Sequence, residues 1–202
     1  TARLLAAALG LGGNAITVSN ALWARMAAHG AIADLDPAAA GRALRSVVAD
    51  RPGAGDATLR FAVVHPFSGH NYELRYWLAA CGIDPDRDVE IVFVPPPLMA
   101  DALASGTIDG YCVGEPWSTA ATTSGLGRIV TIKAAIWRSS PEKVLGVAAK
   151  WAEREPEALA GLLRALCRSA QWCASCENHR ELAEILAARA FIGRPTEWML
   201  HG

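Results

Sequence analysis

The feature that most constrains the fold is an alternation of short apolar runs with longer amphipathic segments. Extended, β-branched patterns recur as AITVS, LRFAVVHP, VEIVFVPP, IDGYCVG, RIVTIKA and VLGVAA. Between most of them lie stretches whose apolar residues recur with the period of a helix. A strand–helix series of this kind predicts an α/β protein and favours a largely parallel sheet. Ligands of such sheets bind at the carboxyl ends of the strands.

Local capping signals predict where several helices begin. Asp36 followed by Pro37 predicts a helix start, since aspartate caps helices and proline fits their first turn. Ser68 is expected to cap a helix that ends at Gly82, with Leu74, Trp77, Leu78 and Cys81 on its buried face. Asn20 is a candidate cap for residues 20–30. The segment ARLLAAAL is expected to be helical, and RPGAGDA is the most linker-like stretch.

Charge and hydropathy exclude several classes of protein. The 202 residues are 52% hydrophobic, with a mean hydropathy of +0.20 and a formal net charge of −1. A basic face for nucleic acid is not expected at this charge. Apolar runs stay well short of the roughly 20 residues that a membrane-spanning helix needs. The start, TARLLAAALGLGG, resembles an export signal superficially, but no clear cleavage site follows and we do not expect one there.

The cysteines suggest no metal or redox centre. An odd count of five, without regular spacing, is not typical of a disulfide scaffold and fits reduced thiols slightly better. WCASC contains a candidate redox pair, Cys173 and Cys176, and His179 could join them as a zinc ligand. However, the pair follows a helical pattern, where the helix dipole opposes a thiolate, and no fourth ligand is nearby. Ordinary structural thiols are the expected interpretation.

No motif for covalent or nucleotide chemistry is present. The sequence lacks GxSxG, a Walker loop and GxGxxG, and no cysteine stands at a strand-to-helix turn. Asp109 and Glu115 could form a carboxylate pair, but EPW more simply turns the chain after a strand. We therefore expect no enzyme activity, no catalytic residue, no metal and no cofactor.

The predicted strand ends carry a different chemistry. The strand FAVVHP leads to His70 in the first turn of a helix, where exposed N–H groups and the dipole favour an anion. IDGYCVG ends at Gly114, whose missing side chain allows close backbone approach. SSPEK places Lys143 on a loop before another strand. A structural or surface role for His70 remains open, beside the hypothesis of an anion site.

Several motifs together make the chain resemble a known family. GHNYELRYWLAA, VPPP, GTIDGYCVGEPW and SPEK strongly resemble the nitrate-binding branch of ABC-transporter solute-binding proteins. The branch includes periplasmic nitrate-, nitrite- and bicarbonate-binding proteins and a cytoplasmic nitrate/nitrite sensor. The resemblance implies a two-lobed α/β fold of the type II periplasmic-binding-protein kind, with a cleft between the lobes. It implies the later half of lobe 1 in residues 1–60, lobe 2 in 61–137 and a return to lobe 1 in 138–202, with the first lobe incomplete.

The resemblance also implies four ligand-binding residues. His70, Gly114 and Lys143 match the histidine after the first strand of lobe 2, the glycine of VGEPW and the lysine of PEK. Asn14 aligns where the family commonly has glutamine. Nitrate is planar and accepts hydrogen bonds only, so Lys143, the Gly114 N–H, the His70 ring and an inward-turned Asn14 amide would suit it. A bicarbonate site would need an acceptor for the ligand's own proton, or a cation.

Two settings for such a binding module stay open. A transport component would bind nitrate or nitrite, with bicarbonate as the lesser alternative, and dock on an ABC permease in the periplasm or at the membrane. A cytoplasmic sensor would change lobe closure on ligand binding and release an RNA-binding antiterminator protein. GGNAITVSNALW, NYELRYW and the cysteines resemble the sensor slightly more, and direct nucleic-acid contact is expected in neither setting.

Overall fold

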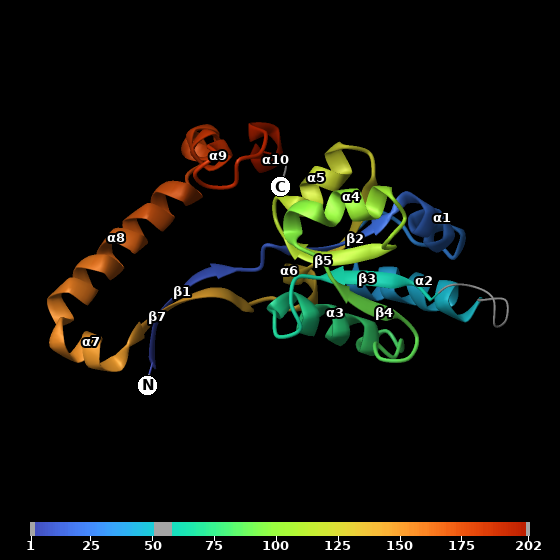
Figure 1. Cartoon of the computed structure of the whole chain (residues 1–202), viewed down its shortest axis with the longest axis horizontal. Helices are drawn as coiled ribbons and strands as arrows, with labels where there is room; N and C mark the ends of the chain where they lie inside the picture. Colours follow the sequence, from blue (N-terminus) through green and yellow to red (C-terminus); the bar gives the residue numbers. More distant parts are fainter. Residues whose placement is uncertain (1–2, 51–57, 201–202) are drawn as a thin grey trace. The chain divides into compact units, whose positions relative to one another are not determined.

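A computed structural model describes residues 3–50 and 58–200 of the chain (Figure 1). The linker-like segment RPGAGDA lies outside these residues. The chain divides into two compact units. One is the continuous segment Gly13–Arg138, here called the sheet unit. The other, here called the ribbon unit, joins the residues up to Gly12 with those from Ser139 onward.

A five-stranded sheet organises the sheet unit, in the order β4-β3-β5-β2-β6. Its strands are β2 (Asn14–Ser19), β3 (Arg60–Val63), β4 (Glu90–Phe93), β5 (Gly110–Gly114) and β6 (Gly127–Ile132). Strand β3 runs parallel to β4 and β5, whereas β2 runs antiparallel to both β5 and β6. The strands β3, β4, β5 and β6 thus share one direction, and β2 alone runs against them. The expectation of a largely parallel sheet is therefore right except at β2.

Helices cover both faces of this sheet, as Figure 1 shows. They are α1 (Asn20–Ala28), α2 (Pro37–Ala49), α3 (Gly69–Ala80), α4 (Met99–Ala104), α5 (Trp117–Thr123) and the short α6 (Lys133–Ile136), with a 3₁₀ turn, η2, at Pro96–Leu98. Phe61 and Val63 join a buried cluster with α1, α2 and α3, while Ala62 joins one with α4 and α5. The two-residue period of a strand thus sends alternate side chains into two cores.

Local capping chemistry explains where the helices begin. Asp36 caps α2 by accepting from the N–H of Ala38, and Ser68 caps α3 by accepting from the N–H of Asn71, both as predicted. The predicted cap at Asn20 is wrong: Ser19 is the N-cap of α1 and accepts from the N–H of Leu22. Serine and asparagine both cap well, so the pattern alone does not choose between neighbours.

The ribbon unit has a different construction. Strand β1 (Arg3–Leu11) pairs antiparallel with β7 (Pro141–Ala148). The remaining elements are α7 (Ala149–Arg154), α8 (Pro156–Ala174), the 3₁₀ turn η3 (Cys176–Asn178), α9 (His179–Ala187) and α10 (Thr196–Leu200). The helix expected in ARLLAAAL is wrong, because pairing with β7 overrides the helical preference of its alanines and leucines.

The compact units have their own boundaries, at 12/13 and 138/139. The division into lobes at 60/61 and 137/138 stays a prediction. Residues 14–50 belong to the sheet unit because β2 pairs with β5 and β6, and because α1 and α2 share a core with α3. Separately, none of the helices in residues 3–50 and 58–200 is long and apolar enough to cross a membrane.

Candidate functional site

One edge of the sheet unit gathers the ends of four strands. Asn14 begins β2 and is the Cα partner of Gly114, the last residue of β5. Strand β3 runs parallel to β5, so its continuation into α3 starts at the same edge and carries His70 in the first helical turn. Strand β6 ends there too, and Lys133 follows it directly. Three of the four predicted ligand-binding residues are therefore brought to one edge.

Gly114 is the point where these residues approach one another. A β-carbon built on Gly114 would lie 3.3 Å from Asn14 Oδ1 and 3.9 Å from His70 Nε2. The absent side chain of Gly114 thus lets the Asn14 carbonyl oxygen and the His70 imidazole pack close to its backbone. Its predicted part in approach to a ligand stays a prediction.

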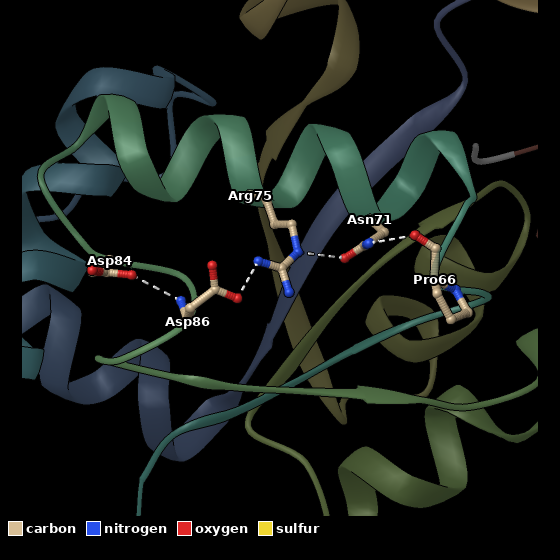
Figure 2. Close-up of polar contacts among 5 residues, drawn as sticks. All are labelled: Pro66, Asn71, Arg75, Asp84 and Asp86. Carbon is tan, nitrogen blue, oxygen red and sulfur yellow. Dashed lines mark hydrogen bonds and ion pairs between the residues drawn. The ribbon is translucent and has the colours of Figure 1, made fainter.

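A network of polar contacts holds the loop before His70 (Figure 2). Asn71 donates to the carbonyl of Pro66 at 2.6 Å, and Arg75 Nε donates to Asn71 Oδ1 at 3.1 Å. Arg75 also pairs with Asp86 at 2.6 Å, and the N–H of Asp86 donates to Asp84 at 3.0 Å. These contacts tie the loop before α3 and the first turn of that helix to the loop that follows it.

Behind Asn14 lies a buried ion pair. Glu73, one turn after His70 on α3, accepts from Lys133 Nζ at 2.6 Å through Oε1 and from Asn14 Nδ2 at 2.8 Å through Oε2. The side chains of Lys133 and Glu73 are only 2% and 3% exposed. Burying two charges is costly unless they are paired and hydrogen-bonded, and here each carboxylate oxygen has a donor.

The ion pair also holds the Asn14 side chain. One N–H of its amide donates to Glu73, and its carbonyl oxygen is the side-chain atom nearest to a β-carbon built on Gly114. The predicted contact of the amide NH₂ with a ligand stays a prediction.

Lys143 belongs to the ribbon unit and lies within β7, not on a loop as predicted. It is the Cα partner of Gly10, and its ammonium group contacts the carboxylate of Glu142 at 2.5 Å. Its side chain is 68% exposed. Its part in an anion site accordingly stays a prediction.

The alternative centres considered from the sequence find structural explanations. Asp109 accepts from the N–H of Arg60, and Glu115 accepts from the N–H of Thr119, so the two carboxylates stabilise a strand start and a helix start. Cys173 lies near the end of α8 and Cys176 begins η3. Within residues 3–50 and 58–200 no group of histidine, cysteine or acidic residues is placed to hold a metal ion.

Sequence reasoning missed Glu73 and Lys133. A weak signal was present, since Glu73 follows His70 by three residues and therefore shares its helical face. Lys133 closes an otherwise apolar strand pattern, RIVTIKA. A charge at either position suggests a buried ion pair only when α3 and the end of β6 are known to contact each other. The sequence does not show that contact, because Glu73 and Lys133 are 60 positions apart.

Comparison with known proteins places this geometry in a family context. The profile of the NMT1-like family matches residues 3–187. A bicarbonate transport ATP-binding protein of Synechococcus elongatus is 45% identical over 137 residues, which are 68% of this chain and 21% of that protein. A nitrate/nitrite binding protein of the same species is 37% identical over 150 residues, 74% of this chain and 34% of the relative.

A solved structure extends the similarity to nearly the whole chain. The crystal structure of the periplasmic nitrate-binding protein from Synechocystis has a TM-score of 0.80 and 29% identity, and it covers 98% of this chain and 48% of that one. The fold is thus that of a periplasmic solute-binding protein, as predicted. The chain spans about a fifth to a third of these curated relatives and about half of the solved protein.

Proposed function

The chain belongs to the NMT1-like family, and from that premise we propose that it binds a small planar oxyanion without turning it over. Nitrate and nitrite are the first ligands to test, and bicarbonate is the alternative. The observation that carries the proposal is the meeting of Asn14, Gly114 and His70 at one end of the sheet, with His70 in the first turn of α3. Relatives named for nitrate, nitrite and bicarbonate support this ligand class.

The chemistry of the edge suits such a ligand. Helix α3 is 12 residues long, so its first turn offers backbone N–H groups and a favourable dipole to an anion. His70 can donate from a ring nitrogen, and the missing side chain at Gly114 permits approach to the backbone. The buried charges of Glu73 and Lys133 pair with each other. Lys143 is the proposed source of the positive charge that a monoanion needs.

Calorimetric titration tests the ligand class. The full-length protein is titrated with nitrate, nitrite, bicarbonate and sulfate. The buffer contains none of these four anions before the titration begins. We expect saturable binding of at least one planar monoanion and much weaker binding of tetrahedral, doubly charged sulfate. Sulfate binding as tight as that of every planar anion would reject the proposal, and so would the absence of binding by all four.

We infer that the module serves ABC transport, since the relatives described above are named as transport or binding proteins. Its setting would then be periplasmic or membrane-associated, with an ABC permease as partner. The second candidate is a cytoplasmic sensor that acts on an RNA-binding antiterminator. The sequence of residues 12–23 and 71–77 resembles that sensor slightly more. Affinity purification of the tagged protein from its own cells separates the two: permease subunits support transport, and an RNA-binding regulator supports sensing.

A further inference from the structure

Asn71 joins the start of α3 to the loop in front of that helix. Its side-chain amide donates from Nδ2 to the carbonyl of Pro66 at 2.6 Å, and the residue is only 6% exposed. Its Oδ1 accepts from Arg75 Nε at 3.1 Å (Figure 2). A carbonyl can only accept a hydrogen bond and a guanidinium can only donate one. The two partners therefore require the same orientation of the amide, and a turned amide would lose both hydrogen bonds.

Arg75 is itself held from the surface. Its Nη1 pairs with Asp86 Oδ1 at 2.6 Å, and the two side chains are 33% and 77% exposed. Asp86 lies in the loop that follows α3, where its N–H donates to Asp84 Oδ1 at 3.0 Å. A chain of polar contacts thus runs from the loop after α3, through Arg75 and Asn71, to the loop before it.

Hydrogen bonds fix the loop in front of α3 to the helix at two places. Ser68 Oγ accepts from the N–H of Asn71 at 3.3 Å, which ties the last residue of the loop to the first turn. The side chain of Asn71 ties the loop again, two residues earlier, at the carbonyl of Pro66. His70 lies in the first turn, between Ser68 and Asn71. The predicted ligand-binding histidine is therefore flanked by the residues that join loop and helix.

We propose that Arg75 is a positioning residue for the anion site. By satisfying the buried Oδ1 of Asn71, it holds that amide toward Pro66 and so keeps the loop and the first turn of α3 in one arrangement. His70 and the N–H groups of that turn then meet the ligand in a fixed geometry, which lowers the ordering cost of binding. The proposal rests on the oxyanion-binding function above, and Arg75 acts on the ligand only through Asn71.

Calorimetric titration of two arginine variants with nitrate, nitrite and bicarbonate measures this role. Arg75→Met keeps most of the side-chain length and removes both polar contacts. We expect it to weaken anion binding by about 2- to 10-fold, the usual range for one hydrogen bond. Arg60→Met is the matched control, because Arg60 also pairs with a carboxylate of the sheet unit, that of Glu90, at 2.7 Å. The control should keep the wild-type affinity, and circular dichroism verifies that both variants are folded.

A double-variant cycle distinguishes positioning from a general loss of stability. Asn71→Ser removes the amide through which Arg75 acts on the loop. Arg75→Met should therefore lower the anion affinity no further when it is combined with Asn71→Ser, since residues that act as a unit do not give additive effects. Additive losses of affinity would mean that Arg75 acts by another route, and they would overturn the proposal.

A spectroscopic readout follows His70 without any ligand. The chain has five histidines, so histidine-selective ¹³C labelling gives few ring signals, and His70→Gln identifies the one in question. We expect Arg75→Met to shift the His70 signal, whereas Arg60→Met should leave it unchanged. An unchanged His70 signal in folded Arg75→Met overturns the positioning role even where the wild type binds oxyanions well. A wild type that binds no oxyanion overturns the proposed function, and the His70 signal still decides whether Arg75 positions the first turn.

A surface variant covers the case in which Arg75→Met fails to fold. Asp86→Ala changes a side chain that is 77% exposed, and it releases Arg75 from the loop after α3. We expect a smaller loss of anion affinity than for Arg75→Met, together with a shift of the His70 signal. Wild-type affinity and a wild-type His70 signal in Asp86→Ala would overturn the proposal.

Discussion

The sheet unit and the ribbon unit differ most in how they bury apolar side chains. In the sheet unit, strands and helices enclose two clusters that include Phe61, Trp77, Leu44 and Met99, each at most 2% exposed. In the ribbon unit, Ala183 is the one buried residue among the described side chains of residues 6–12 and 139–200. Helix α8 has no buried residue over its 19 positions.

This difference shows which unit can fix the positions of its side chains through a buried core. Asn14, His70 and Gly114 belong to the unit with a closed core, and the buried Glu73–Lys133 pair lies behind Asn14. Lys143 belongs to the two-stranded ribbon, and a two-stranded ribbon has little stability by itself. The three residues Asn14, His70 and Gly114 are thus held by a closed core, whereas the side chain of Lys143 is mostly exposed on the ribbon.

The largest expected effect concerns the buried ion pair. Lys133→Met leaves the Glu73 carboxylate buried without its cation, and we expect it to lower the free energy of unfolding by about 3–5 kcal/mol. Arg60→Met, which breaks the exposed Arg60–Glu90 pair, should cost under about 1 kcal/mol. Urea titration followed by circular dichroism measures both. Equal losses in the two variants would mean that the burial of Glu73 has no energetic consequence.

A pair of leucines compares the two units directly. Leu44→Ala in the core of the sheet unit should lower the free energy of unfolding by about 2–5 kcal/mol, through lost contacts and a cavity. Leu162→Ala on α8, where the side chain is 39% exposed, should change it by about 0.5 kcal/mol or less. Urea titration again gives both values. Should Leu162→Ala prove as costly as Leu44→Ala, the apolar face of α8 is packed in the native protein.

One residue from each unit tests the division of labour in binding. Hydrogen bonds to charged groups contribute about 1.5–3 kcal/mol, so His70→Ala should weaken anion binding by roughly 10- to 150-fold. Lys143→Ala should reach or exceed the upper end, because it would also remove the charge proposed to balance the anion. His70→Gln keeps a donor and should lose less. Calorimetry provides the affinities, and wild-type binding by both alanine variants would contradict the proposed site.

The smallest effect is expected at the thiols of the ribbon unit. Cys173→Ser combined with Cys176→Ser should leave anion affinity and zinc content unchanged, since the two residues flank the end of α8 and no metal-binding group is found in the described residues. Calorimetry and elemental analysis check this expectation. Stoichiometric zinc that disappears in the double variant would reveal a metal site in the ribbon unit.

The features that sequence reasoning predicted well are governed by local chemistry. Asp36 with Pro37, and Ser68, mark helix starts because a cap and the N–H group it accepts from lie within three residues. Residues 3–11 could not be assigned in this way. Their alanines and leucines suit a helix, and only pairing with β7, 130 or more positions away, makes them a strand.

The candidate site shows the same division. His70 and Gly114 could be placed at strand ends from residue patterns alone. The orientation of the Asn14 amide could not, because it depends on Glu73, 59 residues further along the chain. Hydrogen-bond polarity at a site is set by tertiary contacts, so a residue type in a motif does not disclose which of its atoms faces a ligand.

The continuous segment Gly13–Arg138 interrupts the ribbon unit as a cassette within the chain. Its ends emerge side by side, since Ala15 near one end and Ile132 near the other are partners in adjacent strands. The flanking sequence is equally close together, because Leu11 is the partner of Pro141. Removing the cassette would therefore leave a gap that a short linker spans. A gene could exchange one such cassette for another, and with it the set of hydrogen-bonding atoms around Gly114, without redesigning the strands that carry it.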